Sequence, residues 1–190
     1  MKLILTRHGE TIENKMGLAQ GQLIQGKLTE LGIEQAKKLA LRLKNEKIDA
    51  IYSSDLERAA NTAKEIMKYH KDTPFYLAKE LREVDLGRFA GKNTSSINWE
   101  KRPMGIETRA HMGERIKRLL DNVYKKYPDD NVLFVGHGGI NKVLINLIVD
   151  KGVDYMNQIR PYYNTSVSIF EIKEDQNHKV HLLNCIKHLE

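Results

Sequence analysis

Leu3-Ile4-Leu5-Thr6-Arg7-His8-Gly9 runs an apolar stretch straight into His-Gly, and Leu133-Phe134-Val135-Gly136-His137-Gly138 repeats this plan later in the chain. Both stretches are typical of short buried strands that end at a histidine. If the two strands are parallel neighbours, both imidazoles project into one crevice beyond the strand ends. We therefore predict that His8 and His137 share a site; the alternative for either one alone is a histidine that merely caps its strand.

Strands and helices alternate along the rest of the chain. The hydrophobic pattern predicts strands at 2–6, 50–52, 75–77 and 131–136, a hairpin from 166–173 and 179–186, and helices at 29–44, 108–127 and 140–149. A further helix follows Ser53-Ser54-Asp55, which offers capping oxygens. The apolar stripes of the two earlier helices are Ile33, Ala36, Leu39, Ala40 and Leu43, and Leu56, Ala59, Ala60, Ala63, Ile66 and Met67. This alternation predicts an α/β fold, a three-layer α/β/α sandwich with a mostly parallel central sheet.

Length and composition predict an ordinary globular chain. Its 190 residues, 41% hydrophobic and 29% charged, indicate a single domain over 1–190 and exclude a disordered or collagen-like class. Residues 87–112 fit neither the helical nor the strand period, so we expect a lid or small insertion there. No apolar stretch reaches the ~20 residues that cross a bilayer, and the N-terminus lacks a signal-peptide pattern. We expect a cytoplasmic protein without membrane contact.

The net charge of +6 invites a nucleic-acid hypothesis. The lysines, however, are interleaved with acids along amphipathic segments, which is typical of solvated faces. We expect no nucleic-acid partner, because an anionic small molecule explains a mild positive excess equally well. The single cysteine, Cys185, excludes an intramolecular disulfide and a cysteine-rich zinc site. We interpret it as a buried strand residue, the alternative being a nucleophile.

Two further side chains can reach the predicted crevice. Arg58 lies in the first turn of the helix that follows the second strand, and beside Arg7 it would form the bidentate pair expected for a phosphate. An arginine at such a position is otherwise a surface residue. Glu83 lies between apolar positions near the predicted lid. A carboxyl group shielded from water by a lid can hold a proton near neutrality, as a general acid must.

These residues carry a resemblance to a known family. Thr6-Arg7-His8-Gly9-Glu10-Thr11 with Asn14 resembles the signature of the histidine phosphatase superfamily, in its phosphoglycerate-mutase-like branch. Further blocks follow in the family's order and cover nearly the whole chain: 28–32 with 35–36, 53–56 with 58–59 and 62–63, 81–83, 105 with 107–108, 135–139 and 164–167. One departure concerns the loop after Gly21, where Gln25 and Lys27 stand at the places of the family's usual Asp and Pro.

The resemblance implies a phosphomonoesterase that acts on a small phosphorylated metabolite through a phosphohistidine, without metal or other cofactor. It implies His8 as the nucleophile and Glu83 as the proton donor. The residues that it implies around the phosphate are Arg7, Asn14, Gly21, Arg58, His137 and Gly138, with Gly138 offering a backbone N–H. To attack phosphorus, His8 must be neutral at one nitrogen, and we expect a backbone carbonyl to hold its other N–H.

Several alternatives remain open at this point. A cofactor-dependent phosphoglycerate mutase shares the first half-reaction; Lys101 and Arg102 would then clamp a carboxylate, or else form an exposed basic pair. The short chain favours hydrolysis. A non-catalytic phosphate-binding or scaffold protein, and hydrolysis by zinc held on His8, His137 and Glu83, are the other readings. The physiological phosphomonoester is not named by any segment. An edge strand near the C-terminus permits a homodimer.

Overall fold

A central sheet of six strands runs through the computed structural model, which describes residues 1–99, 101, 103–150 and 162–190. The strand order is β3-β2-β4-β1-β5-β6. The first four strands in this order are parallel, whereas β5 runs antiparallel to β1 and β6 antiparallel to β5. Their bounds are β1 Lys2–Arg7, β2 Ala50–Ser53, β3 Phe75–Leu77, β4 Asn131–Gly136, β5 Val167–Glu171 and β6 Lys179–Cys185.

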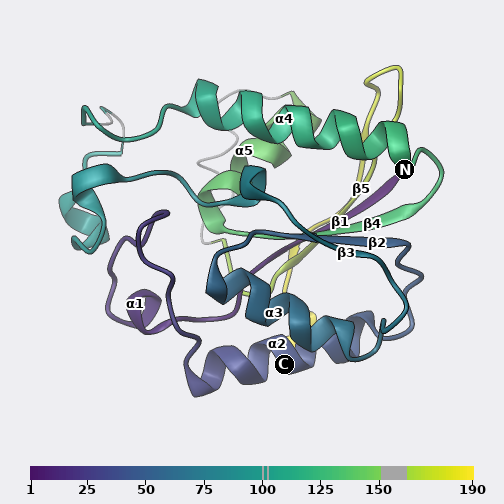
Figure 1. Cartoon of the computed structure of the whole chain (residues 1–190), viewed down its shortest axis with the longest axis horizontal. Helices are drawn as coiled ribbons and strands as arrows, with labels where there is room; N and C mark the ends of the chain where they lie inside the picture. The colour runs from purple at the N-terminus through teal and green to yellow at the C-terminus, as the bar shows by residue number, and fades with distance from the viewer. Residues whose placement is uncertain (100, 102, 151–161) are drawn as a thin grey trace.

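The pairing of β1 with β4 places the two His-Gly segments side by side. Arg7 is opposite Gly136 in this parallel register, so His8 and His137 leave the sheet at neighbouring positions. The inner residues of both strands are buried, which explains their uninterrupted apolar sequence. The loops that follow the parallel strands gather at the same end of the sheet as the short helix α1 (Figure 1).

Helices cover both faces of the sheet. Helices α2 (Glu30–Leu43) and α3 (Glu57–Met67) lie on one face, and α4 (Arg109–Lys126) and α5 (Gly138–Val149) lie on the other (Figure 1). The short α1 spans Ile12–Lys15, and single 3-10 turns span Lys79–Leu81, Gly87–Phe89, Thr94–Ser96 and Lys187–Leu189. The predicted three-layer α/β sandwich with a mostly parallel sheet is therefore confirmed.

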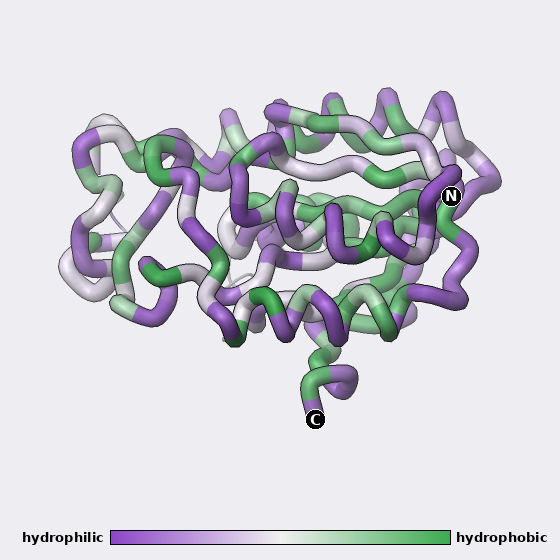
Figure 2. The backbone as a smooth tube through the Cα atoms, turned by 60° about the horizontal axis from the view of Figure 1, so that its bottom comes forward, coloured by the Kyte–Doolittle hydropathy of each residue, from purple (hydrophilic) through white to green (hydrophobic). Residues whose placement is uncertain are grey.

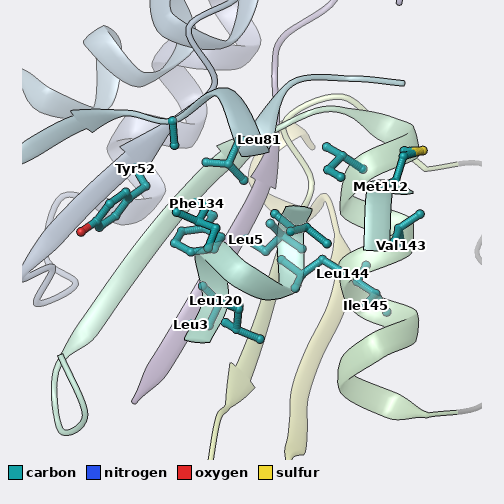
Figure 3. Packing of buried hydrophobic residues seen from close by; sticks show 14 of the residues in the cluster. Leu3, Leu5, Tyr52, Leu81, Met112, Leu120, Phe134, Val143, Leu144 and Ile145 are labelled. Carbon is teal, nitrogen blue, oxygen red and sulfur yellow. The ribbon is translucent and has the colours of Figure 1, made fainter. Parts of the chain in front are cut away.

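Successive side chains of the central strands point to opposite faces of the sheet and belong to two separate hydrophobic cores. Leu3 and Leu5 pack with Phe134 and the residues of α4 and α5 (Figure 3), while Ile4 packs with Leu133 and the residues of α2 and α3. This division follows from the two-residue side-chain period of a strand. The hydropathy colouring agrees, because the central strands are largely hydrophobic whereas the helices alternate between the two classes (Figure 2).

The predicted strands and helices, including the C-terminal hairpin, are confirmed with ends that shift by a residue or two. Several details were wrong. Ile33 is 40% exposed, because Gly32 takes the inward position. Ser53-Ser54-Asp55 does not cap α3 with side chains: the N-cap is Leu56, without a side-chain cap bond. Cys185 is only partly buried, since it ends the edge strand β6.

The segment 87–112 is irregular only in its first part. Thr108 caps α4 by accepting a hydrogen bond from His111 N at 3.1 Å, so residues 109–112 already belong to that helix. Met112 is fully buried there. Of the predicted basic pair, Lys101 is exposed and Arg102 lies outside the described residues. In the part of the chain that the structure describes, no helix is both long and apolar enough to cross a bilayer.

Candidate active site

A pocket of about 180 Å³ lies where β1 ends, among the loops at that end of the sheet. It is lined by six of the residues expected at the site: Arg7, His8, Asn14, Gly21, Arg58 and Glu83. His137 is fully buried behind this lining, with its ring centroid 5.1 Å from that of His8. The structure thus brings together side chains that come from β1, α1, α3, the loop before α4 and the end of β4.

His8 is held as a neutral imidazole with one nitrogen free to react. Its Nδ1 lies 2.7 Å from the carbonyl oxygen of Gly9. A carbonyl can only accept, so Nδ1 carries the proton and Nε2 keeps its lone pair. Burial lowers the pKa of His8 well below its usual value, and the positive charges of Arg58 and Arg7 lower it further. The expectation that a backbone carbonyl holds this ring is confirmed.

His137 is also neutral but has the opposite tautomer, with its proton on Nε2. The Nε–H of Arg58 donates to Nδ1 of His137 at 3.1 Å, so Nδ1 accepts and the proton is on Nε2. Burial, followed by the charge of Arg58, lowers the pKa of His137 well below its usual value. Among the described residues its Nε2 is buried without a hydrogen-bond partner. The ring therefore offers one unused N–H donor beside His8.

Arg58 is buried and mostly engaged with the loop that follows α1. Its Nη1 donates to the carbonyls of Ile24 and Gln25, and its Nη2 donates to that of Gly21 at 2.9 Å. Together with the bond to His137, these contacts leave one Nη2–H for a ligand among the described residues. The expected bidentate fork is thus reduced to a single donor, because the loop turns its carbonyls inward. Burial lowers the pKa of Arg58 to about 10, which keeps it charged at neutral pH.

The inward turn of this loop depends on two left-handed glycines, Gly21 (φ +58°) and Gly26 (φ +71°). A Cβ added to Gly26 would lie 2.1 Å from Oε1 of Gln20 and 3.1 Å from Cδ of Arg58. The loop that lacks the family's usual Asp and Pro therefore still closes tightly on Arg58. Gln25 contributes by accepting a hydrogen bond from the backbone N of Glu57 at 3.1 Å.

Arg7 and Asn14 retain donors for an anion. Nη1 of Arg7 donates to the carbonyl of Tyr162, while its buried Nε has no partner among the described residues. The Oδ1 of Asn14 accepts from the backbone N of Thr11 and from the side-chain amide of Asn164, both at 3.3 Å. This orientation leaves the Nδ2 hydrogens of Asn14 as the donors that can serve the pocket.

Glu83 binds the first turn of α5. One carboxylate oxygen accepts from Gly139 N at 2.9 Å, and the other accepts from Ile140 N at 3.1 Å and from its neighbour Val84 N. A Cβ at Gly138 would lie 3.6 Å from Nε of Arg7. The two helix residues whose backbone N–H groups bind Glu83, Gly139 and Ile140, come directly after Gly138.

The remaining wall of the pocket is largely apolar. It consists of Leu18, Ala19, Gln20, Val84, Leu86, Thr94 and Trp99. Trp99 also donates its indole N–H to the Thr94 carbonyl at 3.0 Å, so it lines the pocket and anchors the segment at once. Lys92 lies over the Phe89 ring, and neither residue lines the pocket. Within the described residues, no group of three or more His, Cys, Asp or Glu side chains is placed to hold a metal ion.

Three residues that support the site were not singled out from the sequence. Thr62 accepts from Gly9 N and donates to the Arg58 carbonyl, which ties α3 to the His8 segment. Asn164 donates to the His8 carbonyl at 2.9 Å as well as to Asn14. Arg115 holds the carbonyls around Glu83. For Thr62 and Asn164, the only signal in the sequence was their place in the family-like blocks. For Arg115 the sequence offered no signal.

The chain is similar to known proteins over its whole length. The sequence model of the histidine phosphatase superfamily (branch 1) matches residues 3–185. Bacillus stearothermophilus YhfR has a TM-score of 0.91 and 29% identity, with 100% of this chain and 99% of that one covered. A phosphoserine phosphatase from Entamoeba histolytica, solved with 3-phosphoglyceric acid, has a TM-score of 0.86 and 28% identity at 100% and 99% coverage. A metal-independent phosphoserine phosphatase of Arabidopsis thaliana is 33% identical over 75% of this chain and 66% of its own length.

Proposed function

Because this chain belongs to branch 1 of the histidine phosphatase superfamily, we propose that it hydrolyses small phosphomonoesters through a phosphohistidine on Nε2 of His8. The observation that carries the assignment is the neutral, buried His8 ring, whose Nδ1–H is held by the Gly9 carbonyl. This arrangement leaves one nucleophilic nitrogen beside two arginines. Phosphatases among the relatives support the same reaction.

The first half-reaction transfers the phosphoryl group to the enzyme. The Nε2 lone pair of His8 forms the N–P bond while the P–O bond to the alcohol breaks, and Glu83 gives its proton to the departing oxygen. A phosphomonoester resists attack because its oxygens are negatively charged. The free donors of Arg7, Arg58, Asn14 and His137 neutralise that charge before the nucleophile approaches.

The second half-reaction returns the enzyme to its starting state. Glu83, now a carboxylate, takes a proton from water as the water oxygen attacks phosphorus. The N–P bond breaks, its electron pair returns to Nε2 of His8, and inorganic phosphate leaves. Glu83 thus acts first as acid and then as base.

Acid-labile labelling tests the nucleophile. After brief exposure to a ³²P-labelled phosphomonoester, the wild-type enzyme should carry label that acid removes and alkali does not. His8→Ala should lose both the label and turnover. Label that persists in His8→Ala would show that another residue is the nucleophile, and retained turnover would remove the phosphohistidine from the mechanism.

We propose that the reaction needs no metal. Arg7 and Arg58 already supply positive charge in the pocket, where they would repel a divalent cation. Activity should survive EDTA and be inhibited by vanadate, which mimics the pentacoordinate state. Loss of activity in EDTA that Zn²⁺ restores would favour the metal-dependent alternative.

We propose water, and not a second phosphoglycerate, as the acceptor. The described residues that line the pocket include no cation besides Arg7 and Arg58, so none is left to hold a substrate carboxylate. Incubation with 3-phosphoglycerate and a trace of the 2,3-bisphosphate should release phosphate. Efficient interconversion with little phosphate release would instead identify a mutase.

We propose that the irregular part of 87–112 is a lid within a single domain, which Thr94 and Trp99 in the pocket wall support.

We propose the reducing cytoplasm as the location of the protein, in keeping with its single cysteine. The edge strand β6 would be the surface for a homodimer, which sedimentation equilibrium can measure.

A further inference from the structure

Arg115 is a buried arginine that the mechanism above does not use. It belongs to α4, is 7% exposed, and donates from every guanidinium nitrogen. Nε and Nη2 bind the two carboxylate oxygens of Glu107 at 2.8 and 3.0 Å. Nη1 also donates to the carbonyls of Glu80 and Arg82, and Nη2 donates to that of Glu83 at 3.1 Å. All five N–H donors are therefore used.

Glu107 completes a clamp on the same segment from the other side. Its carboxylate accepts from Asp85 N at 3.0 Å, and its own backbone N donates to the Asp85 carbonyl at 2.8 Å. Burial by itself would raise the pKa of Glu107, but the hydrogen bonds from Arg115 and Asp85 outweigh it and lower that pKa. Glu107 is therefore ionised at neutral pH, and the clamp is an intact ion pair.

The clamp fixes the residues on both sides of Glu83. This segment is a loop after a 3-10 turn, so no helix or strand ladder determines where the Glu83 side chain lies. Its backbone carbonyl is held by Arg115 and by Nε2 of Gln22, which donates at 3.0 Å. With the carbonyl held, the carboxylate reaches the backbone N–H groups of Gly139 and Ile140 at the edge of the pocket.

We propose that Arg115, paired with Glu107, is a positioning residue for the proton donor Glu83. The proposal rests on the proposed function, since it assigns Arg115 a role through Glu83 and not through the substrate. A planar fork that is always charged can hold three carbonyls and a carboxylate at once, which an ammonium group cannot do. Displacement of a catalytic group by about 1 Å can cost about 100-fold in rate.

The nature of the leaving group separates positioning of an acid from general structural support. p-Nitrophenolate departs without a proton, whereas the alkoxide of glycerol 2-phosphate needs one. Loss of the proton donor should therefore lower kcat/KM far more for glycerol 2-phosphate than for p-nitrophenyl phosphate. Glu83→Gln provides the reference, with an expected loss of about 100-fold or more on the alkyl ester and under about 10-fold on the aryl ester.

The test compares Arg115→Met, Arg115→Lys and the control Ile116→Ala on both substrates. Ile116 is the next residue of α4 and is fully buried, so its truncation loosens the helix without touching the clamp. Arg115→Met should lose at least about 10-fold more on glycerol 2-phosphate than on the aryl ester, and Arg115→Lys should lie between it and wild type. Ile116→Ala should change both substrates by one common factor.

Each other outcome contradicts a stated claim. Equal losses on both substrates for the Arg115 variants, as in Ile116→Ala, would overturn the positioning role and leave the proposed function standing. Equal losses for Glu83→Gln would overturn the role of Glu83, and the positioning role with it. If thermal unfolding shows that Arg115→Met does not fold, Arg115→Lys and Glu107→Gln carry the same comparison.

Discussion

The tautomers of His8 and His137 are set by what each Nδ1 contacts. The Gly9 carbonyl accepts from Nδ1 of His8, which leaves a lone pair on Nε2 of that ring. Arg58 donates to Nδ1 of His137, which leaves the proton on Nε2 of that ring. Both rings are therefore neutral, and each presents at Nε2 the group that the proposed reaction needs. Burial lowers the pKa of each ring well below its ordinary value. The same two residues therefore couple catalysis to the pH dependence of stability.

We predict that acid lowers the free energy of unfolding through these two histidines. Their pKa values are lower in the folded state than the ~6.5 of an unfolded histidine, so below that pH the unfolded chain binds protons that the folded chain does not. Stability is therefore retained above pH 6.5 and falls as the pH drops below it, by up to about 1.4 kcal/mol per pH unit for each ring. Urea titrations between pH 7.5 and 5.5 measure the slope. His137→Gln should be less steep than wild type; an unchanged slope would contradict the shifted pKa.

Gly139→Ala should impair proton donation without unfolding the protein. The new Cβ would lie 2.4 Å from Oε1 of Glu83 and push the carboxylate off α5. We expect kcat/KM for an alkyl phosphate to fall by about 10-fold or more. The matched control is Gly113→Ala on α4, where a Cβ meets nothing within 4 Å, and which should add about 0.5–1 kcal/mol of stability. Full activity in Gly139→Ala would contradict the observed contact.

Helix α4 connects the irregular part of 87–112 to the site. It begins at the Thr108 cap, immediately after the irregular residues, and carries Arg115 two turns further on. The Thr108 cap therefore fixes the start of the helix that carries Arg115, so the stability of this helix end affects the position of Arg115 beside Glu83.

Thr108→Ala should destabilise the protein by about 1 kcal/mol, because it removes the acceptor for His111 N. Thr108→Ser keeps a hydroxyl in place and should retain most of that stability. Urea-induced unfolding measures both variants. Equal stability of Thr108→Ala and wild type would mean that water replaces the cap at no cost.

The positions of the helices and strands could be predicted from the sequence. The side-chain contacts between distant segments could be predicted only in part. The strands, the helices and the shared crevice of His8 and His137 follow from local patterns. The loop carbonyls that occupy Arg58 do not, since they depend on how a distant glycine-bearing loop folds back. Arg115 was missed for the same reason: on its own helix it is a charged residue like others, and only the tertiary packing buries it.

At the scale of the whole molecule, the pocket joins residues that lie far apart in the sequence. The phosphate would contact groups from β1, α1 and α3 at once, and His137 follows β4. A ligand that binds only when all of these are assembled stabilises the folded state by mass action.

Vanadate should therefore raise the thermal unfolding midpoint. At 100 times its Kd the gain is about 2.7 kcal/mol in the free energy of unfolding. Arg7→Ala should lose this response at the same vanadate concentration, whereas Arg42→Ala, which removes an arginine on the outer part of α2, should keep it. A vanadate-induced shift in Arg7→Ala equal to that of wild type would place the anion elsewhere.

The position of β1 in the sheet has a consequence for biosynthesis. This strand is translated before the other five, yet its two neighbours are β4, at 131–136, and β5, at 167–171. Until those segments have been translated, the apolar Leu3-Ile4-Leu5 of the nascent polypeptide has no native strand to pair with. The strand that leads into His8 thus emerges before its partners and completes its pairing only after β5 has been translated.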